Sequence, residues 1–156
     1  MKNLPVILML AYAATLILGL VFRGLLDGPV DLSEFLSLRV IVPLVLVMPF
    51  LETIFIQFLL IEIVMKIGGG RQAALYVGAV VAAVVFVAMH LAMNGLFNSV
   101  VYGIPGALSL STMYVVSRDG GSQRAFFNTW MLLLCSNLLL VLSMAFYGMA
   151  ITGYGE

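Results

Sequence analysis

An acidic residue in the middle of a long apolar stretch is the feature that most constrains what this chain can fold into. The stretch covers residues 40–65, and Glu52 lies near its centre. A helix needs about 20 apolar residues to cross the hydrocarbon core of a bilayer, so Glu52 would lie at membrane depth. A carboxylate there costs on the order of 3 kcal/mol on insertion scales. Glu52 is therefore predicted either to serve a function with a partner on another helix or to be a protonated acid hydrogen-bonded to a neighbouring helix.

The whole sequence has the composition of an integral membrane protein. It is 63% hydrophobic and 9% charged, whereas soluble domains are about half apolar and about a quarter charged. The net charge is zero, which gives no indication of nucleic acid as a partner. We predict an all-α membrane protein that forms one domain over residues 1–156, as a bundle of about five transmembrane helices. The predicted spans are residues 4–22, 40–65, 73–93, 96–116 and 125–147.

Connecting segments and helix breakers add detail to this prediction. Residues 24–38 are expected to form either a short interfacial helix between the first two spans or an early start of the second span. Asn94-Gly95 is a stop signal at the end of the third span. Pro49 removes one backbone donor inside the second span and leaves the carbonyl four residues earlier without its partner. A kink that faces other spans is therefore expected just before Glu52.

The few charged residues near the span ends predict an orientation. Cytoplasmic loops of membrane proteins are enriched in Lys and Arg. One side carries five basic residues and the other two, so the N-terminus is predicted to be cytoplasmic and the C-terminus outside. Glu62 and Lys66, four residues apart near the end of the second span, are predicted to form an ion pair. The five basic residues are Lys2, Lys66, Arg71, Arg118 and Arg124, and the two are Arg23 and Arg39.

Three polar residues on different spans are predicted to lie at similar depths. At the helical rise of 1.5 Å per residue, Glu52 and Asn137 each lie about 21 Å from the basic face, and His90 about 27 Å. His90 is the only histidine of the chain. These depths predict one shared polar site in the outer half of the membrane. The alternatives are a core histidine with satisfied hydrogen bonds and an asparagine that serves only to bind two helices together.

The same residues stand in three short patterns that resemble the signatures of the CPBP family of intramembrane proteins. This family comprises the CAAX-prenyl-proteases and the bacteriocin-processing intramembrane proteases. Its pattern is Glu-Glu-x-x-x-Arg, then Phe-x-x-x-His, then His-x-x-x-Asn/Asp, on successive membrane helices. Here the first pattern is Glu52-Thr53-x-x-x-Gln57, the second is Phe86-x-x-x-His90 and the third is Leu133-x-x-x-Asn137. The resemblance covers approximately residues 45–142.

The chain departs from this family pattern at three positions. Thr53 and Gln57 replace a Glu–Arg pair, and both change from charged to neutral residues. They are four residues apart, so they share a helix face and can hydrogen-bond to each other. Leu133 stands where the family has its second histidine, and the chain has no other histidine to take that place.

The resemblance implies roles for the site residues. Glu52 would be the base that activates water, and His90 and Asn137 would be its polar partners. A catalytic zinc site uses three protein ligands that are usually rich in histidine, and an amide oxygen is a weak zinc ligand. We therefore expect neither a metal nor another cofactor in this site. The supporting residues are Thr53, Gln57 and Phe86.

Three functions are compatible with these residues. The favoured one is a CPBP-like protein with a degenerate catalytic site, which binds membrane segments of a partner. The second is an active intramembrane endopeptidase that uses Glu52 as general base with His90 and Asn137. The third is a non-enzymatic accessory subunit of a larger membrane complex, in which His90 would ligate a pigment or haem. The expected partners are membrane lipid, a transmembrane segment of a partner or substrate protein, and further subunits of an oligomer or larger complex.

Overall fold

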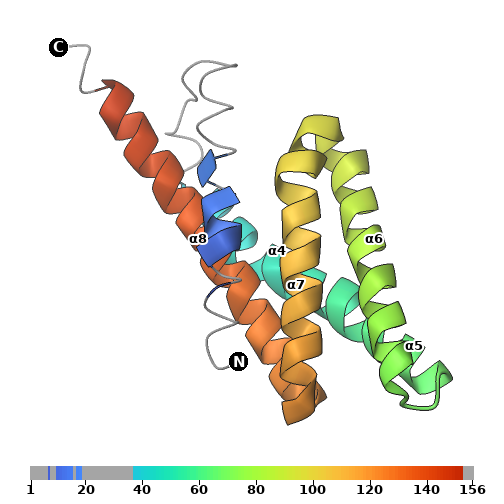
Figure 1. Ribbon diagram of the computed structural model, residues 1–156. Coiled ribbons are helices and arrows are strands. Elements are labelled where there is room, and N and C mark those ends of the chain that lie inside the picture. Colours follow the sequence, from blue (N-terminus) through green and yellow to red (C-terminus); the bar gives the residue numbers. More distant parts are fainter. Residues whose placement is uncertain (1–6, 8–9, 16, 19–36, 153–156) are drawn as a thin grey trace.

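The computed structural model describes residues 7, 10–15, 17–18 and 37–152, and every element in these ranges is helical (Figure 1). The predicted all-α fold is therefore confirmed. Three π-helical segments, which have wider turns than an α-helix, interrupt the α-helices. The elements are α3 Leu38–Val42, η1 Pro43–Val47, α4 Met48–Glu52, η2 Thr53–Leu59, α5 Leu60–Ile67, α6 Gln72–Asn98, η3 Ser99–Gly103, α7 Ile104–Ser117, the 3-10 turn η4 Arg118–Gly120, and α8 Ser122–Thr152.

Four helices are long and apolar enough to cross a membrane: Pro43–Ile67, Gln72–Met93, Gly95–Gly120 and Ser122–Ser143. They correspond to the last four of the five predicted spans. The predicted first span, residues 4–22, is described only in part, and the proposed interfacial segment, residues 24–38, lies almost entirely outside the described residues. Within the described part, residues 10–15 are helical.

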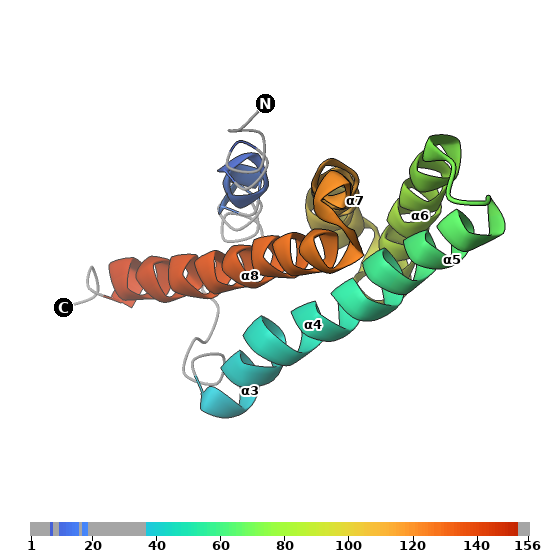
Figure 2. The same cartoon turned by 90° about the horizontal axis from the view of Figure 1, so that it is seen from below.

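The four spans close into a ring. α6 packs against α5 on one side and α7 on the other, α7 packs against α8, and α8 returns to α4 and η2. Figure 2 shows α3, α4 and α5 as one long oblique rod, with α6 and α7 standing side by side. The second span therefore contacts both the third and the fifth, which brings the helices that carry Glu52, His90 and Asn137 into one bundle.

The predicted helix stop at Asn94-Gly95 is present. Gly95 has φ 77° and ψ 175°, so the helical direction breaks there and the next span begins. A positive φ of this kind is favourable only for glycine. The break marks the point at which the chain turns from the third span to the fourth.

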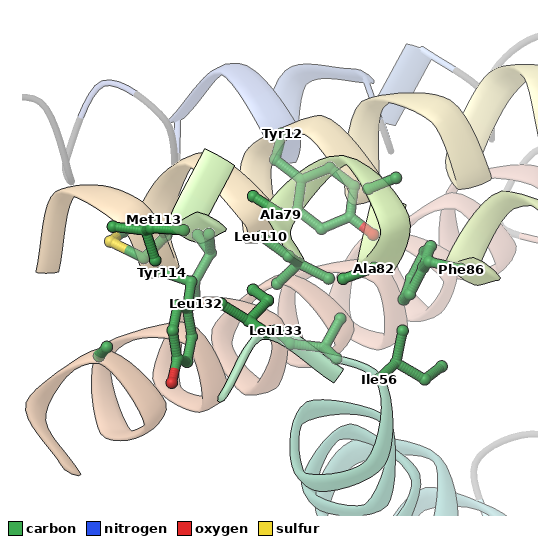
Figure 3. Close-up of a cluster of buried hydrophobic side chains, with 14 residues drawn as sticks. Tyr12, Ile56, Ala79, Ala82, Phe86, Leu110, Met113, Tyr114, Leu132 and Leu133 are labelled. Carbon is green, nitrogen blue, oxygen red and sulfur yellow. The ribbon is translucent and has the colours of Figure 1, made fainter. Parts of the chain in front are cut away.

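The core of the bundle contains large side chains from every span and small residues on α6 (Figure 3). Gly78 marks the closest approach between α5 and α6. A Cβ atom added to Gly78 would lie 3.0 Å from the Cα atom and 3.2 Å from the carbonyl oxygen of Ile61. Small residues permit this kind of backbone contact between membrane helices. The side chains labelled in Figure 3 are Tyr12, Ile56, Ala79, Ala82, Phe86, Leu110, Met113, Tyr114, Leu132 and Leu133.

We predict that Gly78→Ala destabilises the bundle. The new methyl group would meet backbone atoms, which cannot turn aside as a flexible side chain can, and such overpacking costs about 1–3 kcal/mol. The measurement is unfolding of the purified protein in detergent, followed by circular dichroism. Ala88→Val on the exposed face of α6 is the control and is expected to change little. Equal unfolding of the Gly78→Ala variant and the natural protein would contradict the prediction.

Candidate functional site

Glu52 is the last residue of α4, between the π-helical segments η1 and η2. It is half-buried. Its carboxyl group makes no hydrogen bond within the part of the chain that the structure describes, but it is close enough to the Tyr12 hydroxyl for an electrostatic interaction. π-helical turns inside α-helices often occur at functional sites. Here they flank the one acidic residue that lies deep in the second span.

His90 is held in one orientation by two contacts within α6. Its Nδ1 atom lies 3.0 Å from the carbonyl oxygen of Phe86, and its ring stacks on the Phe86 ring with centroids 4.3 Å apart. A carbonyl oxygen can only accept a hydrogen bond, so Nδ1 carries the hydrogen. The Nε2 atom of the neutral ring is then free to accept. The Cβ atom of a residue at Gly103 would lie 3.1 Å from the Cβ atom of His90, so only glycine fits there easily.

Tyr12 is a site residue that the sequence analysis did not identify. A Cβ atom added to Gly106 would lie 2.8 Å from the Tyr12 hydroxyl and 3.3 Å from a ring carbon of Phe86. Tyr12 and Phe86 therefore meet over Gly106, and both are buried in the same cluster (Figure 3). Tyr12 thus lies beside the Phe86–His90 stack and within electrostatic range of Glu52. The sequence did contain a signal for this role. Tyrosines in membrane proteins concentrate at the interfaces, so a tyrosine in the middle of a predicted span is unusual.

Asn137 points toward the second span and binds its backbone. Its Nδ2 atom donates to the carbonyl oxygen of Leu44 over 2.9 Å. In this stretch the backbone bonds reach five residues back, as from the N–H of Met48 to the carbonyl of Pro43. The next bond of this kind would run from residue 49 to Leu44, but Pro49 has no N–H. The unpaired carbonyl therefore lies five residues before Pro49, one residue from the expected position, and the side chain of Asn137 supplies the missing donor.

Thr53 and Gln57 are both fully buried, with 0% exposure. The expected hydrogen bond between them is not formed. Instead, the Ser111 hydroxyl donates to Oε1 of Gln57 over 3.3 Å, while Oγ1 of Thr53 and Nε2 of Gln57 have no partner among the described residues. The wider π-helical turn of η2, which contains both residues, alters the offset on which an i, i+4 pair of an α-helix depends.

Leu133 lies in the apolar core, with 2% exposure. It belongs to the same cluster as Ile56 and Phe86 (Figure 3). The position that resembles the second histidine of the family pattern therefore contributes packing between the spans.

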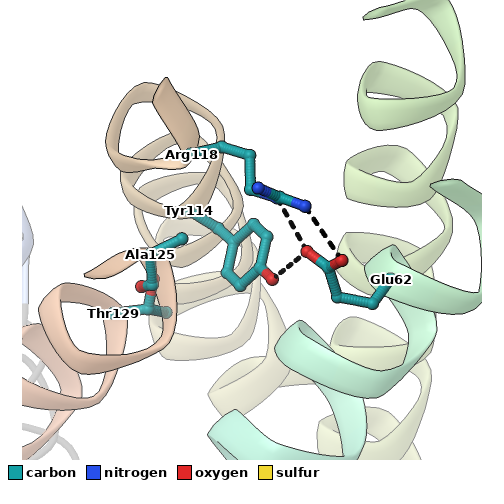
Figure 4. Close-up of polar contacts among 5 residues, drawn as sticks. All are labelled: Glu62, Tyr114, Arg118, Ala125 and Thr129. Carbon is teal, nitrogen blue, oxygen red and sulfur yellow. Dashed lines mark hydrogen bonds and ion pairs between the residues drawn. The ribbon is translucent and has the colours of Figure 1, made fainter. Parts of the chain in front are cut away.

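A second polar cluster forms around Glu62 in α5, near the C-terminal end of the second span (Figure 4). Arg118 donates from Nε to Oε1 of Glu62 over 2.8 Å and from Nη2 to Oε2 over 3.0 Å. The Tyr114 hydroxyl donates to the same carboxylate over 2.7 Å. The ion pair predicted between Glu62 and Lys66 is therefore wrong. The planar guanidinium group matches both carboxylate oxygens at once, whereas Lys66 is exposed.

No group of three or more His, Cys, Asp or Glu side chains gathers within residues 37–152 or the described parts of the N-terminal segment. Comparisons of the chain with family models, with curated proteins and with solved structures found no match. The chemistry of the site residues therefore provides the basis for assigning a function.

We predict that Asn137 and Pro49 are energetically coupled. Asn137→Ala leaves the Leu44 carbonyl unpaired inside the bundle, which costs about 1–3 kcal/mol. In a Pro49→Ala background the restored N–H allows the helix to pair its own carbonyls, so the same substitution is expected to cost less. The measurement is a double-mutant cycle on unfolding in detergent. Equal costs in both backgrounds would show that Asn137 does not replace the missing donor.

We predict that Arg118→Met destabilises the protein by about 1–3 kcal/mol, because it leaves the half-buried Glu62 carboxylate with Tyr114 as its only described partner. Arg71→Met removes an exposed arginine and is the matched control, with little expected effect. Unfolding in detergent at low and high salt measures both variants. An equal effect of the two substitutions would contradict the role of the Glu62–Arg118 pair.

Proposed function

We propose that this chain is a CPBP-like intramembrane protein with a degenerate protease site, and that it binds transmembrane segments of a partner protein. The resemblance of three short patterns to the family signatures supports the scaffold. The main support for a loss of catalysis is the identity of residue 133. Leu133 is a buried apolar residue at the position where the family pattern has a histidine.

The contacts of the remaining residues support the same proposal. Hydrolysis by a general base requires polar groups that position a water molecule beside that base. Asn137 gives its amide hydrogen to the Leu44 carbonyl. Thr53 and Gln57 are neutral and fully buried, so neither offers the charge of the Glu–Arg pair that they replace. Glu52 and His90 are left as the two residues of the pattern that could act on a bound group.

Retention of Glu52 and His90 supports binding. Ionisable side chains at membrane depth are costly, and their retention indicates a function or a partner. Both residues are half-buried, so each is partly accessible from outside the bundle. A transmembrane segment of another protein that brings its own polar group would satisfy them.

The alternative function is an active intramembrane endopeptidase. The free Nε2 atom of His90 and the carboxyl group of Glu52, which has no hydrogen bond among the described residues, favour it. In that case Glu52 would act as the general base and His90 would polarise the water or the substrate carbonyl.

We further propose an orientation with the N-terminus in the cytoplasm and the C-terminus outside. The turn between α5 and α6 and the turn between α7 and α8 lie at the same end of the bundle (Figure 1). These turns and the helix ends beside them carry Lys66, Arg71, Arg118 and Arg124. Basic residues in short loops mark the cytoplasmic side.

We predict that the purified protein in lipid vesicles shows no cleavage that depends on Glu52. The probes are a prenylated peptide with a C-terminal CAAX sequence and a synthetic single-span helix, and the products are read by mass spectrometry. Natural protein, Glu52→Gln and the exposed-carboxylate control Asp119→Asn are all expected to match empty vesicles. Cleavage that Glu52→Gln abolishes and Asp119→Asn retains would establish the endopeptidase instead.

A further inference from the structure

We infer that Tyr12, Glu52 and His90 line one polar site, and that this site takes the side-chain carboxamide of an Asn or Gln from a transmembrane segment. The inference rests on the proposed function and names the chemistry of the segment that would bind. It also adds Tyr12, from the first predicted span, to the residues that the family resemblance implies.

Two glycines place the site residues next to each other. Gly103 and Gly106 are three residues apart across the junction of η3 and α7, and such positions are neighbours on one face of a helix. The His90 side chain lies on Gly103, and the Tyr12 hydroxyl lies on Gly106. The Phe86 ring also borders Gly106, beside the Tyr12 hydroxyl, and it stacks on the His90 ring. A side chain on either glycine would displace the polar group that lies there.

The three polar groups have unused hydrogen-bonding capacity. Within the described residues, neither the hydroxyl of Tyr12 nor the carboxyl of Glu52 forms a hydrogen bond, and His90 uses only Nδ1. The membrane interior supplies no water to replace such partners, so unsatisfied groups there are costly. Together they offer a donor at Tyr12 and acceptors at His90 Nε2 and Glu52.

A carboxamide matches this set because it has one acceptor and two donor hydrogens on adjacent atoms. Its oxygen would accept from the Tyr12 hydroxyl, while its NH2 group would donate to His90 Nε2 and to Glu52. An anionic side chain would meet the carboxyl group of Glu52. A cationic one could pair with Glu52, but it leaves the Tyr12 hydroxyl with nothing to donate to.

Modification of His90 by diethyl pyrocarbonate tests the inference, because His90 is the single histidine of the chain. Its unprotonated imidazole nitrogen attacks the reagent, takes up an ethoxycarbonyl group and releases ethanol and CO2. The protein is reconstituted in phosphatidylcholine vesicles with a leucine-rich single-span helix that carries one central Asn, Leu or Lys. Energy transfer between labelled protein and helix measures association in the same vesicles. The expected result is that the Asn helix slows modification about three- to tenfold relative to the Leu helix, the range of interhelical hydrogen bonds in membranes.

Variants separate the site from general packing. Tyr12→Phe keeps the ring over Gly106 and removes only the hydroxyl, so it is expected to abolish the difference between the Asn and Leu helices. Tyr76→Phe is the matched control, since Tyr76 is exposed and its hydroxyl accepts from Gln72 alone among the described residues, and it should leave the difference intact. Retention of the difference in Tyr12→Phe would overturn the role of Tyr12.

The remaining outcomes also decide the inference. If the Asn and Leu helices associate equally and His90 is modified at the same rate in the presence of either, the carboxamide site is wrong while segment binding stands. Stronger protection by the Lys helix would overturn the inference in favour of a cationic partner. Failure of the Asn helix to associate would show that a carboxamide does not bring a segment to the site. The proposed function fails separately from this inference: it is overturned by peptide cleavage that depends on Glu52, which the vesicle cleavage experiment measures.

Discussion

The hydrogen bond from Asn137 to the Leu44 carbonyl holds together the part of the bundle on which the site depends. Pro49 deprives that carbonyl of its backbone donor, and an unpaired carbonyl in the apolar layer must find another partner. Asn137 provides it from the fifth span over 2.9 Å. The bond therefore joins α8 to the second span at Leu44, eight residues before Glu52. A displacement of α8 would leave that carbonyl without a partner, which is costly in the apolar layer.

Three glycines allow the close helix contacts that surround the candidate site. Gly78 lets α5 and α6 touch backbone to backbone, and Gly103 and Gly106 let His90 and Tyr12 lie directly on α7 and the turn before it. Membrane helices associate through such close packing because lipid offers no hydrophobic driving force between them. In this chain the same glycines that permit packing also make space for the polar groups. Packing and the candidate site therefore depend on the same few positions.

The sequence was sufficient for the helical spans, the stop at Gly95 and the unpaired carbonyl near Pro49, because each follows from local rules of length, backbone geometry and donor count. It was insufficient where the partner is distant in the sequence. The pairing of Glu62 with Arg118 and the contact of Asn137 with Leu44 depend on how helices are rotated about their axes, which spacing along one helix does not reveal. The π-helical turns shifted the unpaired carbonyl by one residue and separated Thr53 from Gln57. Tyr12 was missed because its role depends on a glycine in another span.

The replacement of charged by neutral residues changes the balance around Glu52. Burying an ion pair carries a desolvation cost that good geometry must offset, and the neutral Thr53 and Gln57 at 0% exposure avoid this cost. They also leave the only acid of that helix face without a neighbouring cation among the described residues. A lone acid at membrane depth can remain there if it is protonated or if another group bonds it. The Tyr12 hydroxyl, which lies within electrostatic range of Glu52, and the Nε2 atom of His90 are the two hydrogen-bonding groups of the polar site proposed above.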